Sequence, residues 1–199
     1  MPSRTTLGAA VPVRLLLLAV LVATCSPPAR LVGTELGSAP APDFRLTDAL
    51  TGRPLALSTL RGNVVALAFL YTRCPETCPL TAERFREAQK ALGPEAERVR
   101  FLAVSVDPLN DTPESIRSFS GDHRLERNWH YVIGERSRLE AVWALYGVGA
   151  FSNGAILVSH NDAIFLIDAR GRERVLVHAD TPLDDLINDL RLLVREPSD

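Results

Sequence analysis

Methionine and lysine are almost absent from this chain. Its 199 residues include one methionine, Met1, and one lysine, Lys90. Without thioether side chains in the folded part, a soft metal ion could be bound only by cysteine and histidine. The formal net charge is -2, and like charges form no run, so the basic surface typical of nucleic-acid binding is not expected.

An apolar run long enough to cross a membrane is also lacking. Leu15–Ala23 follows Arg4 and Arg14 and precedes small residues, which is the layout of a secretory signal. At about 1.5 Å per helical residue, this run is too short for a hydrocarbon layer of about 30 Å. We therefore expect residues 1–24 to be a signal peptide.

Cysteine is scarce, and the first of the three cysteines follows this signal directly. Val22-Ala-Thr-Cys25 resembles the cleavage box of bacterial lipoproteins, in which Cys25 would carry the lipid. An ordinary cleaved signal or an uncleaved anchor is the alternative. Each of these alternatives predicts that the domain is exported. A lipoprotein would in addition be tethered to a bacterial cell membrane by an N-terminal lipid anchor, with the domain on the periplasmic or extracytoplasmic side.

Two regions follow the signal. Residues 25–42 hold several prolines among small residues and few large apolar ones, so we expect a flexible tether. Residues 43–199 are long enough for one domain with its own core.

Strand and helix patterns alternate along this domain. A short hairpin is expected from Phe44–Leu46 and Leu55–Ser58. Buried strands then alternate with helices, and a second hairpin and an amphipathic helix close the chain. The expected later strands are 63–71, 99–106, 129–133, 163–168 and 174–178; helices are expected from Pro79, from Asp111-Thr-Pro113, around 139–146 and from Thr181-Pro182. This pattern predicts an α/β domain of the thioredoxin-like type: a mixed central β-sheet with helices on both faces and an N-terminal β-hairpin.

Cys74 and Cys78 lie between a buried strand and the start of a helix. The positive end of the helix dipole favours thiolates there, and we place Cys78 at the helix N-cap. The four-residue offset allows a disulfide or a shared metal ion. A structural disulfide would close only a small loop, which gives it little stabilising effect. A redox pair or a metal site is therefore favoured.

The rest of the sequence bears on this choice. Oxidoreductases of this fold generally have Cys-x-x-Cys and a proline before the facing strand, but here the spacing is one residue longer and no proline occurs between Pro113 and Pro182. The residues ahead of a peroxidatic cysteine are also missing. His160 instead precedes the strand expected beside the dithiol. Two thiolates and one imidazole suit copper, whereas zinc usually takes four ligands.

Three motifs occur in this order: Tyr71-Thr-Arg-Cys-Pro-Glu-Thr-Cys-Pro79, Ser105-Val-Asp-Pro108 with Asp111-Thr-Pro113, and Ser159-His160 before Ile164–Asp168 and Gly171. In order and type they resemble the Sco/SenC family. The resemblance implies a thioredoxin-like domain that binds copper, as Cu(I) and/or Cu(II), through Cys74, Cys78 and His160. It also implies a metallochaperone rather than an enzyme, which helps to mature the copper centre of cytochrome c oxidase.

The partner implied is the apo copper-binding subunit of the oxidase or another copper chaperone. The alternative is a thiol-disulfide oxidoreductase that uses Cys74 and Cys78 as a redox-active pair to reduce the cysteines of that subunit. Glu76 stands where the family usually has Asp, and Ser159 where an Asp commonly precedes the ligand His. Glu76 and Asp107 are candidates for supporting the metal site or contacting the partner, although Asp107 could equally cap the turn after its strand.

Overall fold

The fold is built around three parallel strands with apolar sequences. The computed structural model describes residues 30–125, 127–148, 163–178 and 180–197. Strands β4 (Val64–Leu70), β5 (Val99–Ser105) and β6 (Trp129–Ile133) lie side by side in parallel. All of β4 and nearly all of β5 is buried, as expected for apolar runs covered on both faces.

Five further strands complete one mixed sheet in the order β1-β8-β7-β4-β5-β6-β2-β3. β7 (Ile164–Ile167) pairs antiparallel with β4 and forms a hairpin with β8 (Glu173–Val177). At the other edge, β2 (Arg45–Asp48) joins β6 to β3 (Pro54–Ala56). The predicted mixed sheet and N-terminal hairpin are therefore confirmed.

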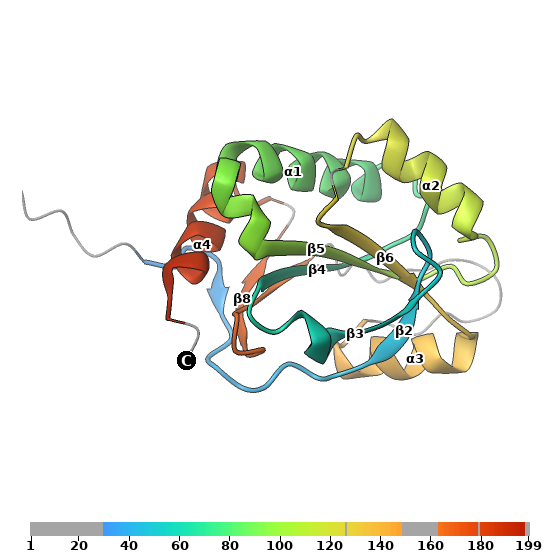
Figure 1. Cartoon of the computed structure of the whole chain (residues 1–199), viewed down its shortest axis with the longest axis horizontal. Coiled ribbons are helices and arrows are strands. Elements are labelled where there is room, and N and C mark those ends of the chain that lie inside the picture. Colours follow the sequence, from blue (N-terminus) through green and yellow to red (C-terminus); the bar gives the residue numbers. More distant parts are fainter. Residues whose placement is uncertain (1–29, 126, 149–162, 179, 198–199) are drawn as a thin grey trace, which may run out of the picture.

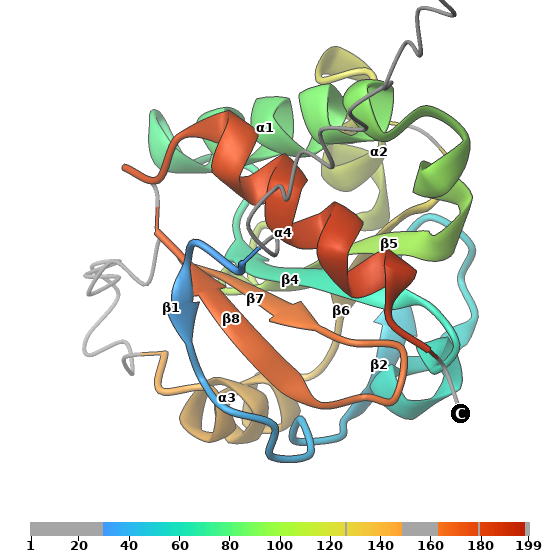
Figure 2. The same ribbon diagram turned by 90° about the vertical axis from the view of Figure 1, so that its left-hand side faces the viewer.

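Helices cover both faces of the sheet, as predicted (Figures 1 and 2). One face packs against α1 (Thr77–Leu92), α2 (Pro113–Asp122) and α4 (Leu183–Arg195), and the other against α3 (Arg136–Leu145). Short 3-10 helices span Leu57–Leu60 (η1) and Gly93–Arg98 (η2). The two cores are centred on aromatic side chains: Phe85, Phe101 and Trp129 in the first, Trp143 and Tyr146 in the second.

The segment before the hairpin differs from the sequence-based expectation. Residues 30–42 belong to the predicted tether, yet β1 (Thr34–Glu35) pairs antiparallel with β8. The backbone N–H groups of Val32 and Gly33 donate to the two carboxylate oxygens of Asp189 on α4, at 2.8 and 2.9 Å. Asp189 is fully buried. The described part of the tether is therefore fixed to the domain rather than free, because a buried carboxylate and a sheet edge satisfy its backbone groups.

Candidate dithiol metal centre

The dithiol lies at the carboxyl end of β4, where the chain turns into α1. The backbone N–H of Cys74 donates to the Tyr71 carbonyl at 3.2 Å, which closes a turn immediately before the helix. Helix α1 begins at Thr77 with Glu76 as its N-cap. The prediction that Cys78 is the N-cap is wrong, because Cys78 lies inside the first helical turn. Pro79 still fits there, since first-turn N–H groups have no intrahelical partner.

The Cys74 sulfur takes the role that a capping side chain usually has. Cys74 Sγ accepts a hydrogen bond from the backbone N–H of Cys78 at 3.3 Å, and it lies 3.3 Å from the Thr77 hydroxyl. Both cysteines are free thiols and are buried, with 8% and 4% of the surface of Cys74 and Cys78 exposed. The more exposed of the two sulfurs, that of Cys74, therefore lies at the positive end of α1.

The two thiols differ in acidity. Burial raises the pKa of Cys74, but hydrogen bonds from Thr77 and Cys78 outweigh it and lower that pKa to about 7. Burial raises the pKa of Cys78 above its ordinary value, and the neighbouring Cys74 adds to the increase. Cys74 is thus the thiolate near neutral pH, and Cys78 keeps its proton until a metal or another electrophile displaces it.

Tyr71 faces the same sulfurs. Burial raises the pKa of Tyr71 to about 12, with further contributions from Cys74 and Cys78. The phenol therefore stays neutral beside a charged thiolate. A neutral O–H next to Cys74 provides polarity without adding a negative charge that would compete with the thiolate.

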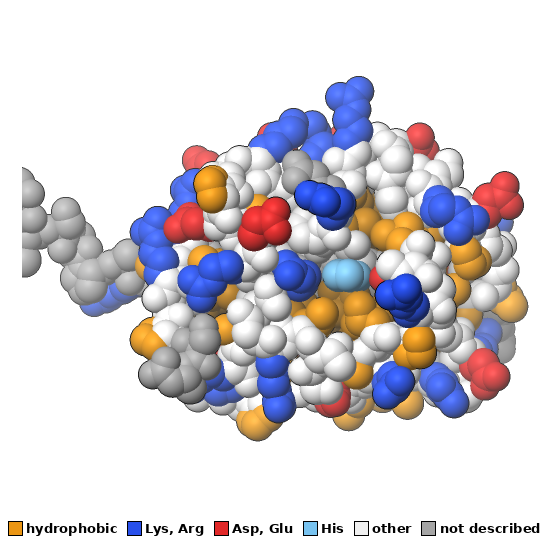
Figure 3. Space-filling model, viewed as in Figure 1, with side chains coloured by type: hydrophobic (Ala, Val, Ile, Leu, Met, Phe, Trp, Pro, Cys, Tyr) orange, Lys and Arg blue, Asp and Glu red, His pale blue; other side chains and the backbone are white. Residues whose placement is uncertain are grey.

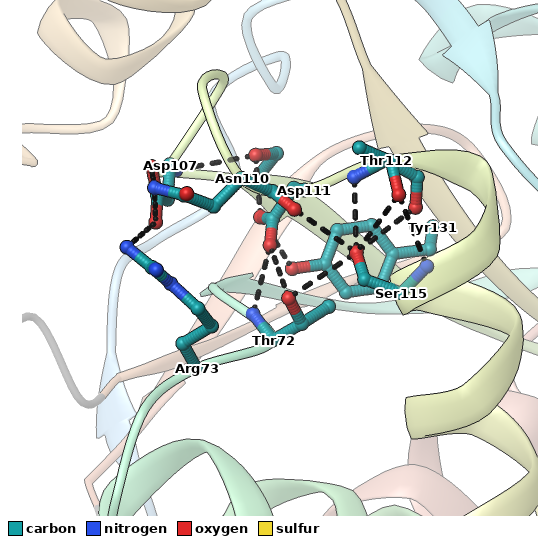
Figure 4. A network of polar contacts seen from close by, with 9 residues as sticks. Thr72, Arg73, Asp107, Asn110, Asp111, Thr112, Ser115 and Tyr131 are labelled. Carbon is teal, nitrogen blue, oxygen red and sulfur yellow. Dashed lines mark hydrogen bonds and ion pairs between the residues drawn. The ribbon is translucent and has the colours of Figure 1, made fainter.

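Asp111 connects the cysteine loop to the sheet (Figure 4). One of its carboxylate oxygens accepts from the backbone N–H and the hydroxyl of Thr72, both at 2.8 Å. The other accepts from the Ser105 hydroxyl at 2.6 Å and lies 3.0 Å from the Tyr131 hydroxyl. Burial raises the pKa of Asp111, partly offset by these donors. Thr72 precedes Cys74 by two residues, so this carboxylate fixes the start of the cysteine loop on β5 and β6.

The sequence identified Asp111 only as part of a helix start. That start is confirmed, since α2 begins at Pro113 with Thr112 as N-cap and Ser115 completing a capping box. The contacts of Asp111 with Thr72 and Tyr131 join residues far apart in the chain, and no local pattern reports them. Thr77 was also missed in the sequence analysis, because its effect on Cys74 depends on the position of the Cys74 sulfur relative to the Thr77 hydroxyl.

Asp107 holds the turn after β5. Its two carboxylate oxygens accept from the Asn110 side-chain amide at 2.9 Å, and its carbonyl accepts the backbone N–H groups of Asn110 and Asp111. Arg73, next to Cys74, lies 3.8 Å from the Asp107 carboxylate. The turn-capping alternative for Asp107 therefore accounts for its contacts. Glu76 acts through its backbone N–H, which contributes to the lowered pKa of Cys74, while its side chain is exposed.

The predicted third ligand, His160, and Ser159 before it lie outside the described residues, as does Cys25. Within residues 30–125, 127–148, 163–178 and 180–197, no cluster of three or more His, Cys, Asp or Glu side chains could hold a metal ion. The described donors are thus the two sulfurs. Their softness, proximity and the low pKa of Cys74 fit a soft, thiophilic ion such as copper.

Comparison with known proteins identifies the family. Residues 33–195, most of the chain and both cysteines included, match SCO1/SenC. The chain belongs to the SCO1/SenC family. A relative in Bacillus subtilis, "SCO1 protein homolog", is 29% identical over 146 residues, which cover 70% of this chain and 76% of the relative. The SCO1/SenC assignment therefore rests on the whole folded part.

Solved SCO1/SenC structures share the fold. ScoI of Bradyrhizobium japonicum with copper bound has a TM-score of 0.66 at 25% identity, covering 78% of this chain and 99% of that one. A SCO1/SenC family lipoprotein of Bacillus anthracis has a TM-score of 0.70 at 26% identity, over 81% and 98%. BsSco, described with a disulfide switch, has a TM-score of 0.69 at 26% identity, over 83% and 99%. The predicted thioredoxin-like fold of the Sco type is confirmed.

Two features of this SCO1/SenC domain bear on its N-terminus. None of the helices in the described ranges is long and apolar enough to span a membrane. The domain's first described residue, Arg30, is held through its carbonyl by the Asn188 side chain on α4 at 3.0 Å. The chain therefore enters the domain beside α4.

Proposed function

We propose that the chain is a copper metallochaperone that binds copper through Cys74, Cys78 and His160. Its acceptor would be the apo copper-binding subunit of cytochrome c oxidase or another copper chaperone. The observation that carries the proposal is the pair of reduced, buried sulfurs at the start of α1, one of them with a pKa of about 7. The copper-bound structure of a SCO1/SenC relative supports the choice of metal.

The geometry suits binding that is firm but reversible. Cys74 already offers a thiolate near neutral pH, so copper need displace a proton only from Cys78. Because both sulfurs are buried and preorganised by the first turn of α1, little order has to be created when the metal binds. An incoming thiolate or imidazole of an acceptor would replace the ligands one at a time, starting at the more exposed Cys74.

A second candidate function is thiol-disulfide exchange with the same acceptor. The unequal acidity of the two cysteines favours it, and the disulfide switch named for BsSco supports it. The Cys74 thiolate would attack the partner's disulfide and release one partner thiolate. Cys78, losing its proton, would then attack the mixed disulfide, leaving a Cys74–Cys78 disulfide and a fully reduced partner. This reaction does not need His160.

Anaerobic copper titration of the reduced chain, beside its His160→Ala variant, tests the first function. We expect one copper ion per chain, and a loss of affinity of ten-fold or more in the variant, because one of the three ligands is removed. His178→Ala is the matched control, since His178 is exposed and its substitution should leave affinity unchanged. Wild-type affinity in His160→Ala would refute the third ligand. Weak binding in all three proteins would favour disulfide exchange.

We also propose that Cys25 is lipidated and tethers the domain outside the cytoplasm. The lipoprotein named among the structural relatives supports this. Cys25→Ser should move the protein from the membrane fraction to the soluble exported fraction. Retention of the variant in the membrane would instead favour an uncleaved N-terminal anchor.

A further inference from the structure

The burial of the dithiol limits how a partner can reach it. Cys74 has 8% of its surface exposed and Cys78 has 4%. A protein that takes copper from these sulfurs must bring its own ligand into direct contact with Cys74. Its surface must therefore lie on the residues that border the cysteine loop. Those residues should carry the features by which the partner is held.

One border of the loop is the turn after β5, which presents Leu109. Leu109 is 80% exposed, more than any other large hydrophobic side chain in the described ranges. The turn stands directly beside the cysteine loop, because Arg73 and Asp107 form an ion pair at 3.8 Å across the gap (Figure 4). A single exposed leucine is common on protein surfaces. This one lies beside a metal site that must contact another protein, so it could be buried in that contact.

Hydrogen bonds on both sides of Leu109 hold the turn that carries it. Asp107 accepts hydrogen bonds from both the backbone and the side chain of Asn110, and Asp111 anchors the end of the turn in the buried network with Thr72 and Ser105. A side chain on a backbone that is already ordered loses little entropy when a partner covers it. Covering Leu109 therefore requires no ordering of the backbone that carries it.

A second exposed leucine lies in the first turn of α1. Leu80 follows Cys78 by two residues and is 47% exposed. The described ranges contain four exposed large hydrophobic side chains, and the other two lie elsewhere: Leu145 at the end of α3 and Val32 beside α4. Two of the four therefore lie on the two segments that follow β4 and β5, the first turn of α1 and the turn after β5.

We propose that Leu109 and Leu80 form an apolar docking surface for the protein that receives copper from the dithiol. This inference rests on the proposed function. The partner surface that fits is an apolar patch beside the partner's own copper-binding side chains. Arg73 belongs to the cysteine loop and lies 3.8 Å from Asp107 in the turn that carries Leu109; its side chain is 63% exposed, so it can pair with a carboxylate at the margin of that patch. Figure 3 shows how widely arginine and lysine side chains are spread over the face of the domain seen in that view.

The test compares transfer to a protein with transfer to a small molecule. The full chain, loaded with Cu(I) under anaerobic conditions, is mixed with the reduced apo domain of the oxidase copper-binding subunit from the same organism, or with the Cu(I) chelator bathocuproine disulfonate. Leu109→Ser, Leu80→Ser and the matched control Leu145→Ser are compared with the wild type. The dissociation constant of each metal-free chain for the subunit domain is measured as well.

We expect Leu109→Ser to weaken binding to the subunit about ten-fold, the loss that follows when one leucine is no longer buried. At subunit concentrations below the dissociation constant, transfer should slow by a similar factor. Leu80→Ser should have a smaller effect of the same kind, because Leu80 is less exposed, and Leu145→Ser should have none. Copper capture by the chelator should proceed at the wild-type rate in every variant.

Two results would overturn the docking surface while leaving the proposed function intact. One is wild-type binding and transfer to the subunit by Leu109→Ser. The other is an equal slowing of transfer to the chelator, which would place the effect at the copper site. Failure of the wild-type chain to bind the subunit or to transfer copper to it would overturn the proposed function, and with it this partner.

Discussion

Replacing Thr77 with valine should raise the pKa of Cys74. The Thr77 hydroxyl lies 3.3 Å from Cys74 Sγ and is the largest of the contributions that lower this pKa to about 7. A hydrogen bond to a charged group is worth about 1.5 kcal/mol at the lower end, and one pKa unit corresponds to about 1.4 kcal/mol. We therefore expect the pKa in Thr77→Val to rise by about one unit, to about 8.

The best measurement is the thiolate absorbance near 240 nm of the reduced, metal-free chain as pH rises. Cys25→Ser is included in every protein so that only the dithiol contributes. At pH 7 the thiolate fraction of Cys74 should fall from about one half to about one tenth. The rate with a small disulfide should fall only about two-fold, because a more basic thiolate is a better nucleophile. Absorbance is thus the sharper test.

Thr81→Val is the matched control. Thr81 lies one turn further along α1 and donates its hydroxyl to the Thr77 carbonyl at 3.0 Å rather than to a sulfur. This variant removes the same chemical group from the same helix, so its absorbance midpoint should stay near pH 7. An unchanged midpoint in Thr77→Val, or an equal rise in both variants, would refute the reasoning about the hydroxyl.

The buried network around Asp111 and the proposed lipid on Cys25 allow two further predictions. Asp111→Ala should lower the free energy of unfolding by about 3 to 5 kcal/mol, because the donors on Thr72 and Ser105 lose their acceptor and Tyr131 keeps only the Leu70 carbonyl. Urea unfolding measures this, and a loss below about 1 kcal/mol would contradict the role of the network. Cys25→Ser should release the exported protein from membranes, as fractionation followed by immunoblotting would detect, and an unchanged distribution would count against lipidation.

The strands and helices that the sequence predicted are those with strong local signals. The apolar runs of β4 and β5 and the Thr112-Pro113 start of α2 are all found where they were expected. Strand β1 was missed because it has two exposed residues and no alternating pattern. Its formation depends on the open edge of β8, which a local pattern cannot report.

The candidate site was predicted in its residue types more than in its geometry. Cys74 and Cys78 could be read from their place between a strand and a helix. The unequal acidity of the two cysteines could not be predicted from the sequence, because it depends on the direction of the Thr77 hydroxyl and on the burial of each sulfur. The role of Asp111 likewise depends on contacts that cross from β5 and β6 to the cysteine loop. His160 stays a prediction, since it lies outside the described residues.

The hydrogen bonds of Asp189 to Val32 and Gly33 also limit how much of the chain can serve as a tether between the membrane and the domain. Because Asp189 holds Val32 and Gly33, and Asn188 holds Arg30, the attached chain starts at residue 30 rather than at residue 43. With the lipid on Cys25, residues 25–29 alone would separate the membrane from α4. At most about 3.6 Å per residue gives a reach of about 18 Å. The domain would then work close to the bilayer surface, where only acceptors within that distance of the membrane could be reached.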